Sequence, residues 1–196
     1  MKLFRSILVS ASLLVTVGCA TTYNPDIDYN PEYNFSEINT YHVVDGFQAQ
    51  QQETQALNRN LSSLDNDRIV RAIESNLDLK GMASNPADTA DVLVRFQLVT
   101  QDRTKLTTYN TGIYNCWRCR GVYSYPYPVQ QVEIKNYTEG TLIIDMVDPQ
   151  SKKSVWRSVV SKAVKKSISV EEKQAKVQEL VNAMLATFKQ PIVVEE

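Results

Sequence analysis

Two cysteines three positions apart are the side chains in this sequence best suited to chemistry. Cys116 and Cys119 enclose a tryptophan and an arginine, a spacing found in dithiols that exchange with disulfides. Such a dithiol becomes reactive when the amino end of a helix lowers the pKa of its first thiol. Gly121 and Pro126 follow the pair, so no helix is expected to begin there. We therefore expect a structural disulfide, with a redox-active dithiol as the alternative.

The third cysteine, Cys19, stands at the end of an export signal. A short basic segment precedes an apolar run over residues 7–17, and Gly18 separates that run from Cys19. The run suits a secretory signal and is too short to span a bilayer. Export places the other two cysteines in an oxidising compartment, which favours the structural disulfide.

The segment from Val15 to Cys19 resembles the lipobox of bacterial lipoproteins, although Thr16 stands where leucine is usual. The resemblance implies cleavage before Cys19 and attachment of lipid, palmitate included, to that residue. Ala20 follows instead of aspartate, which implies sorting to the outer membrane, with the domain on the periplasmic side. More than one acyl chain would make this attachment to the membrane stable. The alternative is an ordinary cleavage site that leaves Cys19 as a free thiol.

Aromatic residues gather around the cysteine pair, in a segment that covers residues 109–128. Large rigid rings with polar tips suit the binding of an envelope protein or polymer, and the alternative is that they fold back over the sheet. A second candidate contact is a basic region around the last pair of strands, which is either a solvated face or a contact for lipid phosphates or an anionic polymer. The aromatic candidates are Tyr109, Tyr114, Trp117, Tyr123, Tyr125 and Tyr127, and the basic ones are Lys152, Lys153, Arg157, Lys162, Lys165 and Lys166.

No catalytic residues, metal site or cofactor are predicted. His42 is the single histidine of the chain, and it lies within a predicted strand without a Ser/Asp or Cys motif that would make it a general base. Zinc needs about four ligands, which one histidine and one close cysteine pair do not supply. The net charge of −1 gives no reason to expect nucleic acid as a partner.

The elements that must position these residues follow from periodicity. Two helices are predicted, one over residues 65–80 that ends at Gly81, and one that opens at Ser169 with a capping box to Glu172 and stops at Pro191. Alternation predicts strands over residues 40–44, 91–100 (continuing after a bend to 109), 130–137, 141–148 and 154–164.

This order predicts an α+β fold, with a single mostly antiparallel sheet and two helices packed on one face. The predicted organisation is a signal peptide over residues 1–18, a lipidated cysteine and extended tether over 19–34, and one domain over 35–196.

Several stretches of the chain share a pattern with a known family, namely residues 28–31, 35–41, 66–74, 80–81, 91–94, 139–145 and 155–157. They resemble the DUF4136 family of bacterial lipoproteins, a family of unknown function. The resemblance implies a fold and supplies no catalytic residues. We therefore expect a non-enzymatic, outer-membrane lipoprotein that binds an envelope component, with a thiol–disulfide protein using Cys116 and Cys119 as the alternative.

Overall fold

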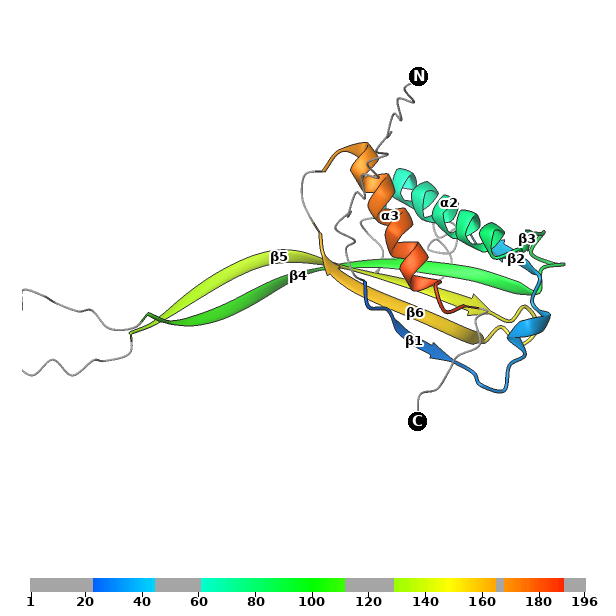
Figure 1. The fold of residues 1–196 in the computed structure, drawn as a ribbon, viewed down its shortest axis with the longest axis horizontal. Coiled ribbons are helices and arrows are strands. Elements are labelled where there is room, and N and C mark those ends of the chain that lie inside the picture. Colours follow the sequence, from blue (N-terminus) through cyan, green and yellow to red (C-terminus); the bar gives the residue numbers. More distant parts are fainter. Residues whose placement is uncertain (1–22, 45–60, 112–128, 165–167, 189–196) are drawn as a thin grey trace, which may run out of the picture.

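The computed structural model describes residues 23–44, 61–111, 129–164 and 168–188, which form one sheet and two α-helices (Figure 1). In chain order the elements are β1 (Asp26–Tyr29), the 3-10 turn η1 (Phe35–Glu37), β2 (Thr40–Val43), α2 (Ser63–Leu79), β3 (Ala83–Ser84), β4 (Val92–Thr111), β5 (Val129–Val147), β6 (Ser154–Ala163) and α3 (Val170–Met184).

The six strands form a mixed sheet in the order β1-β6-β5-β4-β2-β3. The pairings from β1 to β4 are antiparallel, whereas β2 pairs in parallel with both β4 and β3. The α+β class is confirmed, but the expectation of a mostly antiparallel sheet is wrong. The reason is that α2 lies between β2 and β4 in the chain, and a helical crossover returns the chain to run parallel to the strand it left.

Both helices lie side by side over one face of the sheet (Figure 1). A side-chain hydrogen bond of 3.0 Å joins Asn76 of α2 to Asn182 of α3. The buried stripe of α2 includes Ile69, Ile73 and Leu77, which belong to the same core as the apolar side chains of β4 and β5. The hydrophobic effect of burying this stripe holds the helix against the sheet.

Capping interactions with nearby residues determine where the helices begin and end. The side chain of Ser62 accepts a hydrogen bond from the amide of Asp65 and caps α2, which begins at Ser63, two residues before the predicted start. Gly81 has a φ of +78°, a conformation that glycine adopts without steric cost, so the helix ends where predicted. Ser169 accepts from the amide of Glu172, as the predicted cap of α3 requires.

Residues 26–29, which we predicted to lie in the tether, form the edge strand β1. This strand pairs with β6, and Ile27 and Tyr29 pack against the core. Alternation over four residues is too short to stand out from an extended tether in the sequence, and pairing with β6 makes it a strand.

Candidate binding surfaces

A two-stranded arm extends from the sheet (Figure 1). The pairing of β4 with β5 continues from Leu93 opposite Val147 to Thr111 opposite Val129. On one side β6 pairs with β5 only as far as Glu139, and on the other β2 reaches only Val94 of β4. We call residues 102–111 and 129–138 the arm. The strands predicted at 130–137 and 141–148 are therefore one strand.

One face of the arm carries an exposed apolar cluster. Leu106 lies directly opposite Ile134, and Val132 lies opposite Thr108 in the next pair on that face. Leu106 and Ile134 are each 65% exposed and Val132 is 55% exposed. Alternation places the cluster on the face of β4 that carries buried Phe96 within the domain. The core pattern thus continues into the arm, where neither of the two described α-helices covers it.

The opposite face of the arm is polar. Lys105 lies opposite Lys135, and Arg103 forms an ion pair with Glu139 at 3.0 Å. The hydroxyl of Tyr109 donates to the carboxylate of Glu133 at 3.0 Å. Salt bridges at exposed positions contribute little to stability, so this face adds little to the stability of the arm.

Most of the predicted site residues lie outside the described part of the chain. Tyr109 is the exception: it belongs to the arm and is 49% exposed. The remaining aromatic candidates and the cysteines lie outside the described residues, namely Tyr114, Trp117, Tyr123, Tyr125, Tyr127, Cys19, Cys116 and Cys119.

The predicted basic region is divided between separate surroundings. Arg157 donates two hydrogen bonds to the carboxylate of Asp145, at 2.6 and 3.0 Å, and this pairing raises the pKa of the guanidinium. Lys152 lines one cavity and Lys162 lines another. Lys165 and Lys166 lie outside the described residues.

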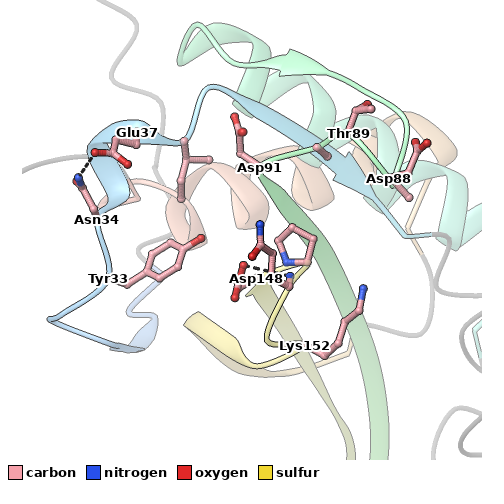
Figure 2. A pocket seen from close by; sticks show the side chains of 13 residues that line it. Tyr33, Asn34, Glu37, Asp88, Thr89, Asp91, Asp148 and Lys152 are labelled. Carbon is pink, nitrogen blue, oxygen red and sulfur yellow. Dashed lines mark hydrogen bonds between the residues drawn. The ribbon is translucent and has the colours of Figure 1, made fainter.

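A cavity of about 690 Å³ lies at the end of the sheet away from the arm, and its lining includes Glu37, Asp88, Asp91 and Asp148 (Figure 2). Two of these carboxylates serve the backbone. Asp91 accepts hydrogen bonds from the amides of Asn39 and Thr40, and Asp148 accepts one from the amide of Ser151. The side-chain and backbone hydrogen bonds from Ser151 lower the pKa of Asp148. This arrangement stabilises turns and strand ends.

Two observations in the described segments concern metal ligands and His42. Those residues contain no group of three or more His, Cys, Asp or Glu placed to hold a metal ion. The ring of His42 donates from Nδ1 to the carbonyl of Asn85 at 3.0 Å, so this nitrogen is committed to the backbone.

Among the described residues, no helix combines the length and apolarity that a membrane span requires.

A second cavity, of about 610 Å³, opens between α3 and the sheet near the base of the arm. Its walls are mainly apolar, with Leu98, Leu142 and Val160 on the sheet and Val177 and Leu180 on the helix. Tyr23 also lines this cleft, together with Lys162, Lys173 and Lys176. The sequence did not indicate this cleft, because periodicity reports which face of an element is apolar and not how closely two elements approach.

A family model described as "Domain of unknown function (DUF4136)" matches residues 25–188. The fold is similar to that of a PDZ domain protein from Parabacteroides distasonis, with 12% identity and a TM-score of 0.53. That match covers 87% of this chain and 36% of the other, so this chain spans little more than a third of that protein.

Two other solved structures are more distant in shape. A DUF4136 family protein from Bacteroides thetaiotaomicron is 17% identical, with a TM-score of 0.44 and coverage of 86% of this chain and 95% of that one. The PelC dodecamer from Paraburkholderia phytofirmans is 10% identical, with a TM-score of 0.43 and coverage of 84% and 97%. No curated protein matches the sequence.

Proposed function

Because this chain belongs to the DUF4136 family of domains of unknown function, its role has to be inferred from its own residues, and we propose that it is a lipid-anchored binding module. Cys19 carries the anchor in the outer membrane, the domain faces the periplasm, and the arm contacts an envelope protein. The observation that carries this proposal is the exposed apolar cluster on the arm.

A role in stabilising the domain does not explain why the apolar cluster of the arm is exposed. A two-stranded ribbon in water is at best marginally stable, because it has no third strand or helix to bury its apolar face. Leu106, Val132 and Ile134 lie on such a ribbon and are more than half exposed. Apolar side chains gathered on a protruding surface are typical of a protein contact.

The edges of the arm support the same conclusion. In the part of the chain that the structure describes, no further strand pairs with the outer edge of either arm strand. Such an edge presents unpaired amides and carbonyls, to which an extended segment of another protein can add as a strand. Each arm strand has ten residues, and at 3.3 Å per residue the arm reaches about 33 Å from the domain.

Tyr23, the first residue that the structure describes, lies close to the base of the arm. Tyr23, four positions after Cys19, lines the cleft at the base of the arm together with Gly140 of β5. A domain anchored by Cys19 therefore carries its arm within reach of proteins embedded in or lying on the same membrane.

Site-specific photocrosslinking in intact cells tests this proposal. A photoreactive amino acid at Leu106 of the full chain is expected to give a discrete protein adduct, and one at Lys105, on the opposite face, is not. The double variant Leu106→Thr/Ile134→Thr keeps β-forming residues but removes apolar surface, so it should lose the partner. The matched control Lys105→Thr/Lys135→Thr, also a directly opposed pair, should keep it.

Equal adducts at positions 105 and 106, or an unchanged partner in the Leu106→Thr/Ile134→Thr variant, would refute the arm as the interface. An adduct with lipid alone at position 106 would instead assign the arm to the membrane. Mass spectrometry of the mature amino terminus tests the anchor independently: the expected start is a lipidated Cys19, and an unmodified cysteine overturns that part.

A further inference from the structure

We propose that the cleft between α3 and the sheet binds one acyl chain of an anionic lipid, with Lys162, Lys173 and Lys176 at its rim to receive the headgroup. This site is separate from the apolar cluster of the arm. It therefore adds a ligand to the proposed binding module and does not require the arm to contact a protein.

The walls of the cleft are those of an apolar ligand site. Leu142 and Val160 are buried in the sheet, while Val177 and Leu180 of α3 are partly buried and pack against the core from the other side. The volume of about 610 Å³ lies within the range of roughly 300–1,000 Å³ that is common for small-ligand pockets. Apolar walls of this kind favour a hydrocarbon over water.

The cleft opens where the elements around it end and side chains become small. β6 ends at Ala163 and α3 begins only at Val170. Gly140 and Ala163 line the cleft where β5 and β6 finish their pairing, and neither has a side chain long enough to fill it. A Cβ atom on Gly140 would lie 3.0 Å from Cγ2 of Val164, so glycine keeps this part of the wall open.

The described residues that line the cleft carry charge of one sign, from three lysines. The carboxylates that pair with two of these lysines lie outside this lining. Nζ of Lys162 lies 4.3 Å from the centroid of the Tyr23 ring, and Lys173 pairs with Asp65 at 2.9 Å. Lys176 pairs with Glu172 one helical turn earlier.

The more exposed of these ion pairs leaves its lysine available to an anion. The side chains of Lys176 and Glu172 are 34% and 49% exposed. An ion pair at such exposed positions contributes at most about 1 kcal/mol, so a phosphate or carboxylate headgroup can replace it at little cost. Lys173 is 44% exposed and adds its charge beside Asp65. An apolar cleft with a cationic rim therefore favours an anionic lipid over a neutral one.

Two sources can supply an acyl chain to this cleft. The source that the cationic rim favours is a free anionic phospholipid of the surrounding membrane. The other is the chain attached to Cys19, which has no anionic headgroup; Cys19 is four positions from Tyr23, and that stretch of chain spans at most about 14 Å. Only the second source depends on the lipid anchor of the proposed function.

Photolabelling of the full chain in vesicles tests the site. The probe is phosphatidylglycerol with a diazirine on its acyl chain, and peptide mapping locates the label. We expect label on the peptides that contain residues 140–142 and 177–180. Val177→Trp, which fills the cleft, should remove that label. The matched control Leu79→Trp, at a position of α2 that is 84% exposed, should retain it.

Further variants test whether the charge of the lysines matters and which source supplies the acyl chain. The double variant Lys173→Gln/Lys176→Gln should lose the preference for labelled phosphatidylglycerol over labelled phosphatidylcholine. If the acyl chain of Cys19 is the occupant, cells fed a diazirine fatty acid give an internal crosslink to the cleft that Cys19→Ser abolishes. If free lipid is the occupant, Cys19→Ser retains label from the vesicles.

The proposal would be overturned if, in the chain without substitutions, both probes label the cleft peptides no more than exposed peptides. This outcome does not depend on whether the Val177→Trp variant folds. Undiminished label in a folded Val177→Trp variant would also overturn the proposal. The variant Leu106→Thr/Ile134→Thr should be labelled normally, so loss of the arm's protein partner and loss of lipid binding are distinguishable.

Discussion

Asp91 holds the parallel pairing of β2 with β4, and its replacement should lower stability without disturbing a binding site. Its Oδ2 atom accepts hydrogen bonds from the amides of Asn39 and Thr40, at 2.9 and 2.8 Å, and from the Thr40 hydroxyl at 2.8 Å. The amide of Asp91 in turn donates to that hydroxyl at 2.9 Å. These bonds join residues 51 and 52 positions apart and set the start of β2 beside the start of β4.

The expected loss in the free energy of unfolding follows from these contacts. A hydrogen bond to a charged group contributes about 1.5–3 kcal/mol when it is shielded from water. Asp91 is exposed, so water replaces much of each bond in the Asp91→Ala variant. We therefore expect the free energy of unfolding to fall by about 2 kcal/mol in total, less than the sum of shielded bonds. For a chain of this size that loss lowers Tm by about 4–8 °C.

Urea denaturation of the full chain, followed by circular dichroism, measures this loss. Asp88→Ala is the matched control, because Asp88 is also exposed and lines the same cavity. A double-mutant cycle with Thr40→Val should give a coupling energy of about 1 kcal/mol, because both single changes break the hydrogen bond from the Thr40 hydroxyl to Oδ2 of Asp91. A loss below about 0.5 kcal/mol for Asp91→Ala, typical of an ordinary surface substitution, would refute this role.

Two further predictions concern Phe188, which follows α3, and Asp65 of α2. Phe188 is 1% exposed and packs edge-on against Trp156 at 5.4 Å, so Phe188→Ala should lower the free energy of unfolding by about 3–5 kcal/mol; a loss near 1 kcal/mol would contradict this packing. Burial opposes the ionisation of Asp65, but hydrogen bonds from Lys173, Ser62 and Arg68 outweigh it and lower its pKa. The resulting stability is present above the unfolded pKa of about 3.9 and is lost as the pH falls through the folded pKa. Asp65→Asn should therefore reduce the acid-induced loss of stability below about pH 4, whereas the exposed control Asp67→Asn should not; equal pH profiles for both variants and the parent would exclude the effect.

The sequence determined the features that depend on neighbouring residues. The helix over residues 63–79 ends at Gly81 because glycine alone adopts its positive φ freely, and Ser169 caps α3 through an amide three residues away. The family was also recognisable, because its stretches are local patterns. The candidate binding surfaces were predictable only in part. Tyr109 was named as a binding residue, but the apolar cluster beside it was not.

Only the tertiary structure decided how distant segments meet. The parallel pairing of β2 with β4, the edge strand at residues 26–29 and the length by which β4 and β5 outrun their neighbours all depend on partners far along the chain. Leu106 and Leu98 have the same alternation in the sequence, yet one is exposed on the arm and the other lines the cleft under α3. Alternation specifies a face, whereas burial depends on whether a helix or strand covers that face, and that is set by packing between elements.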